Sequence, residues 1–256
     1  MCYDSQAQPP LPPGETSPAR GEDIILIASD GNRLAAYAAH PSRPSGASVL
    51  IYPDVRGLHQ FYKDLALRFG EVGITALAID YFGRTAGLTP RDESFDYKPH
   101  VLQLRLDSFK RDVAAGLAWL RDASKTPIFV VGFCMGGSLT LITGTHRDFA
   151  FAGLIPFYAG MSRDFGGAGT VLDFADHVAF PVLGLFGGAD QGIPENAVKQ
   201  LDEELDGAGV EHNLIIYPGA PHSFFDRFAT DYAPASADAW ARVLDFIGRH
   251  RGSVAN

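Results

Sequence analysis

The segment Gly132-Phe133-Cys134-Met135-Gly136-Gly137 places a cysteine between two glycines, after an apolar stretch and before a helical one. This is the G-x-nucleophile-x-G pattern of a nucleophile elbow, with Cys in place of Ser. The nucleophile of such an elbow lies on a strained turn, so the residues two positions before and after it must be small. The N–H groups that begin the following helix would face the sulfur and favour negative charge there. The alternative is a buried structural cysteine beside a glycine-rich turn.

Two further residues could complete a triad, because each lies just beyond an apolar stretch. FPVLGLFGG (180–188) precedes Asp190, and EHNLIIYPG (211–219) precedes His222. Open α/β sheets place their sites beyond the carboxyl ends of the strands, and the order nucleophile, acid, base is that of the α/β-hydrolases. Taken alone, Asp190 could begin a helix and His222 could be a surface histidine. Together with Cys134 they predict a catalytic triad.

The chemistry expected of this triad is acyl transfer through sulfur. His222 would accept the proton of Cys134 and later pass it to the leaving oxygen, while Asp190 would fix the imidazole tautomer and stabilise its charged form. Cys134 would attack an ester carbonyl and form a thioester, which water hydrolyses. The backbone N–H groups of Met135 and Val55 are the predicted oxyanion-hole donors. No cofactor and no metal is expected.

The elements that must position these residues are apolar strands alternating with amphipathic helices. Strands are predicted at 22–28, 33–40, 47–53, 74–80, 126–133, 151–160, 180–188 and 211–219. Helices are predicted at 59–73, 101–124, 135–145, 195–209 and 235–250. Asp30-Gly31-Asn32 is a hairpin signal between the first two strands. The alternation predicts a single α/β domain of the α/β-hydrolase fold over 22–256, with a mostly parallel sheet covered by helices on both faces.

Three segments lie outside these elements. Residues 1–21 are rich in Pro and Gly, and we interpret them as an extended or loosely docked arm, with a disordered tail as the alternative. The connection at 81–100 is long, and such loops are often functional. The segment 161–177 could form a cap over a pocket.

Composition restricts the class of protein. The formal net charge is −9, from 21 Lys and Arg against 30 Asp and Glu, which disfavours nucleic acid and anionic membranes as partners. The two cysteines, Cys2 and Cys134, do not form a disulfide framework and suit a reducing compartment. The first residues lack the apolar core of a secretory signal, and no stretch approaches the roughly 18 apolar residues of a membrane span. We expect a cytoplasmic monomer or homodimer with a small-molecule substrate.

Taken together, these residues resemble the dienelactone hydrolase family, whose type activity is carboxymethylenebutenolidase. The resemblance covers nearly all of 22–250. It rests on the segments GFCMGG (132–137), YPDVRG (52–57), IDYFGR (79–84) and HSFFDR (222–227), and on the surroundings of Asp190. It implies hydrolysis of a small lactone or ester by a carboxylic ester hydrolase.

The resemblance also implies roles for other residues. Asp54 stands where the type enzyme has a Glu that contacts the resting thiol and keeps it neutral; the alternative is a loop acid bonded to nearby backbone. The family holds the carboxylate of its substrate with arginines, for which Arg84 and Arg227 are the main candidates and Arg56 a third. Aromatic side chains at the strand ends, including Tyr81 and Phe224, could line the substrate pocket or simply be core.

Two other functions remain open from the sequence. One is a broad short-chain carboxylesterase with a different natural substrate. The other is a catalytically silent ligand-binding protein on a hydrolase scaffold, which an intact triad argues against. Replacing Arg84 or Arg227 should distinguish the first from a lactonase, because only an anionic substrate needs them.

Overall fold

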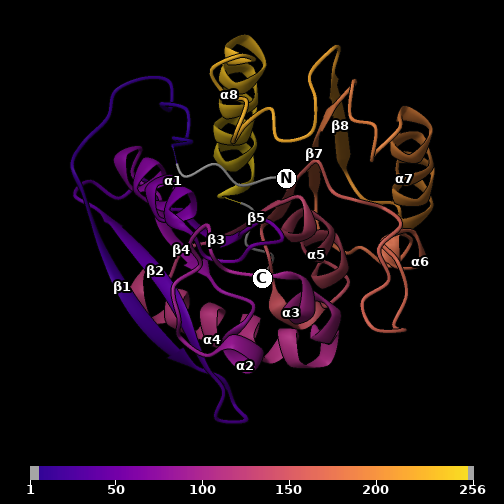
Figure 1. The fold of residues 1–256 in the computed structure, drawn as a ribbon. Coiled ribbons are helices and arrows are strands. Elements are labelled where there is room, and N and C mark those ends of the chain that lie inside the picture. Colours follow the sequence, from indigo (N-terminus) through magenta and orange to yellow (C-terminus); the bar gives the residue numbers. More distant parts are fainter. Residues whose placement is uncertain (1–5, 253–256) are drawn as a thin grey trace.

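The computed structural model describes residues 6–252 and contains one eight-stranded sheet in the order β1-β2-β4-β3-β5-β6-β7-β8 (Figure 1). The strands are β1 (Ala19–Ile27), β2 (Arg33–Pro41), β3 (Ser48–Tyr52), β4 (Thr75–Ile79), β5 (Ile128–Phe133), β6 (Gly153–Phe157), β7 (Val182–Gly187) and β8 (His212–Tyr217). All strands predicted from the sequence are present. From β4 to β8 along the sheet, neighbouring strands are parallel, whereas β2 is antiparallel to both β1 and β4.

Helices cover both faces of this sheet. They are α1 (Gln60–Glu71), α2 (Gly83–Ala86), α3 (Lys98–Gln103), α4 (Leu106–Ala123), α5 (Met135–Thr143), α6 (Leu172–Ala175), α7 (Glu195–Ala208) and α8 (Ala233–His250), with a 3-10 turn η1 (Arg147–Phe149). Helices α1 and α8 share one face, where the rings of Phe69 and Trp240 lie 4.8 Å apart. Helices α4 and α5 lie on the opposite face (Figure 1). The predicted fold class is confirmed.

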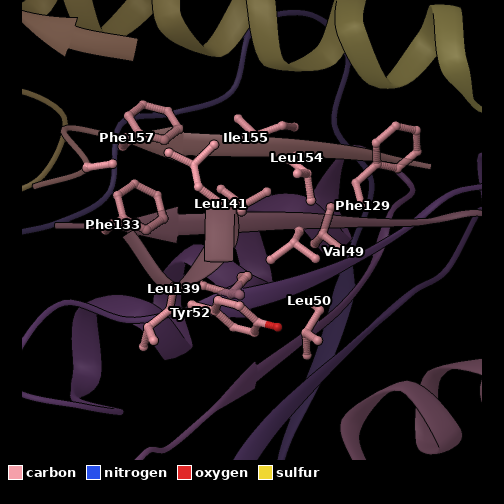
Figure 2. Packing of buried hydrophobic residues seen from close by; sticks show 14 of the residues in the cluster. Val49, Leu50, Tyr52, Phe129, Phe133, Leu139, Leu141, Leu154, Ile155 and Phe157 are labelled. Carbon is pink, nitrogen blue, oxygen red and sulfur yellow. The ribbon is translucent and has the colours of Figure 1, made fainter. Parts of the chain in front are cut away.

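The central strands are apolar throughout because successive side chains point to opposite, covered faces. In β3, Tyr52 lies towards α5, with its hydroxyl 3.4 Å from Thr143 Oγ1. In β5, Phe129 lies towards α8 and contacts the ring of Phe246 at 6.1 Å. Figure 2 shows Leu141 of α5 and Ile155 of β6 among the buried side chains of this core. The core therefore continues through the sheet from one helical layer to the other.

One predicted helix, 101–124, is in fact two. Helix α3 ends at Gln103, Leu104 and Arg105 are extended, and α4 begins at Leu106. Leu104 and Leu106 are both buried, but residues two positions apart lie on nearly opposite sides of a helix. The break lets both leucines enter the core.

The N-terminal segment is docked against the body where the structure describes it. Trp240 Nε1 donates to the carbonyl of Pro10 at 2.9 Å, and the N–H of Ser17 donates to the carbonyl of Glu71 at 2.8 Å. Strand β1 begins at Ala19, so the last residues of the predicted arm already belong to the sheet. Cys2 lies outside the described residues. Within residues 6–252, no helix is both long and apolar enough to cross a membrane.

Candidate active site

The strand register brings the predicted site residues to one edge of the sheet. The ends of neighbouring strands are aligned, as the pairs Tyr52–Gly132, Phe133–Phe157 and Gly187–Tyr217 show. Asp54, Cys134, Asp190 and His222 follow four of these strand ends. Segments far apart in sequence thus meet beyond the carboxyl ends of the parallel strands, as this type of sheet requires.

Cys134 occupies the turn between β5 and α5 in a backbone conformation that side chains rarely adopt, with φ 55° and ψ −115°. A Cβ on Gly132 would lie 2.2 Å from the carbonyl oxygen of Gly136. A Cβ on Gly136 would lie 2.2 Å from that of Pro53. Both glycines are therefore sterically required, as predicted for an elbow. The Cys134 side chain is partly exposed.

Asp190 and His222 interact directly. Asp190 Oδ2 lies 2.6 Å from His222 Nδ1, and Asp190 Oδ1 accepts the N–H of Gly192 at 2.9 Å. Burial alone would raise the pKa of Asp190, but His222 and the backbone N–H groups of Gly192 and Ile193 outweigh it and lower that pKa. The carboxylate is therefore ionised at neutral pH, and it orients the imidazole through Nδ1.

The His222 ring also packs against the ring of Tyr158, a residue that the sequence did not indicate. Their ring centroids lie 4.8 Å apart, and the Tyr158 hydroxyl donates to Asp226 Oδ2 at 2.8 Å. Tyr158 follows β6 with φ 34°, and Ser223 follows His222 with φ 64°. The predicted strand 151–160 placed Tyr158 inside the strand, so its position at the strand end was missed.

The two predicted oxyanion donors belong to segments in contact. Met135 is the first residue of α5, where backbone N–H groups lack a partner within the helix. Val55 lies in the turn after β3, and Pro53, two residues before it in this turn, lies against Gly136. The Tyr81 hydroxyl donates to the carbonyl of Pro53 and holds this turn beside the elbow.

Asp54 is completely buried in the same turn. Its Oδ1 accepts the N–H of Arg56 at 2.8 Å and lies 3.5 Å from Nε2 of His59. Its Oδ2 is buried and has no hydrogen-bond partner among residues 6–252. The backbone bond considered as an alternative role is thus present, and a second carboxylate oxygen remains. His59 was missed because the sequence placed it at the start of a helix.

Comparison with known proteins now identifies the family. A family model described as "Dienelactone hydrolase family" matches residues 34–251. The chain belongs to the dienelactone hydrolase family. This confirms the family that the sequence resembles. It also confirms the predicted class of enzyme, an ester hydrolase.

Two relatives and one solved structure are similar to this chain over most of their length and of its own. A candidate carboxymethylenebutenolidase of Salmonella typhimurium is 28% identical over 90% of this chain and 87% of its own. A candidate 2-oxo-3-(5-oxofuran-2-ylidene)propanoate lactonase of a Bradyrhizobium species is 24% identical over 89% of this chain and 94% of its own. The crystal structure of a candidate dienelactone hydrolase from Klebsiella pneumoniae has a TM-score of 0.79 at 22% identity, over 91% of this chain and 99% of its own.

Arg84, predicted to hold a substrate carboxylate, is paired with acids of the protein itself in the structure. Arg84 donates to both carboxylate oxygens of Asp112, to both of Asp30, and to the carbonyl of Ser108. Asp112 is buried, and burial raises its pKa even though Arg84 and Asn32 donate to it. Arg84 of this dienelactone hydrolase family chain therefore links α2, α4 and the β1–β2 turn, and its donors are already engaged.

Tyr81 and Phe224, for which the sequence left open a place in the pocket lining or in the core, are both buried. Tyr81 is 2% exposed, and burial followed by the charge of Asp54 raises its pKa well above the usual value. Phe224 is fully buried, with its ring 5.8 Å from that of Tyr158 and 4.9 Å from that of Tyr217. Both side chains therefore belong to the core that packs beneath the site residues.

Arg227 and Arg56 lie in loops beyond the strand ends. Arg227, on the loop after β8, is partly exposed, with its guanidinium carbon 4.2 Å from the centroid of the Phe228 ring. Arg56, after β3, is 9% exposed, and its guanidinium carbon lies 5.0 Å from the centroid of the Tyr97 ring. These two arginines remain close in sequence to His222 and Asp54.

The segment 161–177 contains α6 and packs against the rest of the protein. Its residues Phe165 and Val171 are buried. Just before it, the carbonyl of Gly160 accepts a hydrogen bond from Ser138 Oγ of α5 at 2.7 Å. Across residues 6–252, no group of three or more His, Cys, Asp or Glu side chains is arranged to hold a metal ion.

Proposed function

We propose that this dienelactone hydrolase family protein hydrolyses a small lactone or ester through a thioester on Cys134. The observation that carries the proposal is the Asp190–His222 contact of 2.6 Å at the same sheet edge as the elbow cysteine. A histidine held through Nδ1 by a carboxylate presents Nε2 as a base, and a cysteine on an elbow is positioned as a nucleophile.

The proposed reaction has two halves. His222 Nε2 takes the thiol proton, and Cys134 Sγ attacks the carbonyl carbon to form a tetrahedral oxyanion, which the N–H groups of Met135 and Val55 stabilise. As the carbon–oxygen bond breaks, the imidazolium returns the proton to the leaving oxygen and a thioester remains. Water, deprotonated by His222, then attacks the thioester, and the acid product leaves with the thiol restored.

We propose that the resting thiol is kept neutral by Asp54. A carboxylate near sulfur disfavours the thiolate, and Asp54 is buried with one oxygen lacking a hydrogen-bond partner within residues 6–252. A neutral thiol is also less easily oxidised. In this arrangement, ionisation of Cys134 awaits the substrate.

The preferred substrate is a lactone that carries a carboxylate. Two observations support this choice: the names of the curated relatives, and the presence of a partly exposed arginine, Arg227, on the loop that carries His222. Arg227 and Arg56 are the proposed carboxylate-binding residues, since a guanidinium can bind a carboxylate through two parallel hydrogen bonds. Arg84 is not included, because its donors serve Asp30 and Asp112.

A second candidate is a broad short-chain carboxylesterase. The engagement of Arg84 favours it, because one arginine expected to bind an anionic substrate is committed elsewhere. This activity would use the same triad with a neutral ester.

The test compares initial rates on a dienelactone and on p-nitrophenyl acetate for the wild type and Cys134→Ala. The proposal predicts a strong preference for the lactone and no activity of the variant on either substrate. Cleavage of the aryl ester alone would favour the second candidate. If neither substrate were turned over, the enzymatic proposal would fail and the silent ligand-binding alternative would take its place.

A further inference from the structure

A groove of about 740 Å³ lies at the amino-terminal edge of the sheet, opposite the candidate triad. Ile128, Ala152 and Pro181, at the beginnings of β5, β6 and β7, line it. Cys134 follows the far end of the same β5 strand. Six strand residues at about 3.3 Å each separate the two ends by roughly 20 Å, so the groove is distinct from the candidate active site.

One part of the groove wall is apolar. Phe151 and Phe180 both line it, and their rings meet edge to face with centroids 5.5 Å apart. Pro127 and Pro181 add further apolar surface. Pockets for small molecules typically have volumes of about 300–1,000 Å³ and are mostly apolar with a few polar groups. The volume and lining of this groove suit such a ligand.

The remaining wall is cationic. Arg121 at the end of α4, Lys125 just beyond it and Arg147 of η1 all line the groove. Among residues 6–252, no carboxylate lies within 4.0 Å of a charged nitrogen of these three side chains. Arg121 Nη2 donates to the carbonyl of Phe149 at 2.7 Å, which fixes its guanidinium. These three charges gather on a protein whose formal net charge is −9.

One acid beside the groove, Glu211, interacts with residues of α8. His250 also lines the groove, and its Nε2 lies 3.4 Å from Glu211 Oε2. Glu211 Oε1 lies 3.6 Å from Nη1 of Arg249. Glu211 therefore offsets positive charge on α8 and forms no ion pair with Arg121, Lys125 or Arg147.

The backbone at the groove is also unusual. Lys125 and Ala150, which both line it, have φ values of 50° and 48°. The other non-glycine residues with positive φ in the described chain are Cys134, Tyr158 and Ser223, all at the candidate active site. A helix end of this kind usually carries glycine, because a side chain is disfavoured in this conformation. At position 125, that side chain places an ammonium beside the groove.

We propose that this groove binds a small amphiphilic carboxylate. Its apolar body would lie against Phe151 and Phe180, and its carboxylate would be held by Arg121, Lys125 and Arg147. A nucleic acid would need a continuous basic stripe rather than three cations around one groove. The inference does not depend on the activity of the triad, because it concerns the opposite edge of the sheet.

The test is calorimetric titration of the Cys134→Ala protein with octanoate, beside 1-octanol, acetate and inorganic phosphate. We expect one octanoate to bind per chain, with the three other probes much weaker because each lacks either the charge or the apolar body. The double variant Lys125→Gln/Arg147→Gln should bind octanoate about tenfold less tightly or worse. Arg33→Gln, an exposed arginine outside the groove, is the matched control.

A second variant tests the apolar wall without changing charge. Ala152→Trp would fill the groove, so it should abolish octanoate binding while thermal unfolding shows that the protein remains folded. Unchanged octanoate affinity in both the double variant and Ala152→Trp would overturn the assignment. Equal binding of 1-octanol would refute the role of the carboxylate, and equal binding of phosphate would refute that of the apolar wall.

Discussion

Asp190 Oδ2 lies 2.6 Å from His222 Nδ1, across the gap between the loops that follow the neighbouring strands β7 and β8. This contact sets which imidazole nitrogen can act as a base, since Nδ1 is occupied by the carboxylate. It also explains why the pKa of Asp190 is low despite burial, because His222 is the main group that opposes the effect of burial.

Replacing Asp190 by Asn should keep the shape of the site but favour the wrong imidazole tautomer. We expect kcat to fall by roughly 10⁴, the effect of this substitution in a known triad, with little change in KM. Steady-state kinetics on p-nitrophenyl acetate measure this, with Asp231→Asn, an exposed acid, as the control. A loss of less than about tenfold would show that Asp190 is not part of the catalytic machinery.

The same carboxylate should make stability depend on acid pH. Its pKa is lower in the folded chain than its ordinary value of 3.8, so its contribution is present above that value and is lost as the pH falls through the folded pKa. The difference in free energy of unfolding between wild type and Asp190→Asn should therefore shrink between about pH 5 and pH 2. Urea unfolding at several pH values measures it. A difference that stays constant over this range would contradict the assignment.

Much of the fold could be predicted because its pattern is local. All eight strands were predicted: the buried parallel strands are continuous apolar runs, and the β1–β2 pair is marked by a hairpin signal between two strand-like runs. The break before Leu106 could not be predicted, because 101–124 is consistent with one amphipathic helix until the core positions of Leu104 and Leu106 are known. The antiparallel direction of β2 likewise depends on pairing with β4, which is distant in sequence.

Site residues divide in the same way. The common position of Cys134, Asp190 and His222 at one sheet edge could be predicted because each follows a recognisable strand. The ion pairs of Arg84 could not be predicted, because its partners Asp30 and Asp112 lie 54 and 28 residues away along the chain. No local pattern reports such an ion pair.

Arg84 and Arg227 should therefore differ in what they affect. Arg84→Ala leaves buried Asp112 without its cation and should lower the free energy of unfolding by about 3 kcal/mol, while changing KM for a dienelactone and for p-nitrophenyl acetate alike. Arg227→Ala should raise KM for the anionic lactone about tenfold or more and leave the neutral ester unaffected. Chemical unfolding and paired kinetics measure both variants. The reverse pattern would restore Arg84 as the carboxylate-binding residue.

Asp54 should control how readily the thiol reacts. In a Cys2→Ser background, we expect slow alkylation of Cys134 by iodoacetamide at neutral pH and about tenfold faster alkylation in Asp54→Asn, because the variant removes a charge that disfavours the thiolate. Asparagine can still accept the Arg56 N–H through its side-chain oxygen. The exposed pair partner of Arg242, changed as Asp238→Asn, is the control. Rapid alkylation of Cys134 in the protein that retains Asp54 would contradict this role.

The most direct test of the account is to identify the residue that carries the acyl group. Wild type and Cys134→Ala are mixed with p-nitrophenyl acetate, quenched in acid within the first turnovers and examined by intact and peptide mass spectrometry. We predict a single acetyl group on Cys134 in the wild type, which builds up as the first p-nitrophenol is released, and none in the variant. An acetyl group on another residue, or turnover that persists in Cys134→Ala, would contradict the central claim.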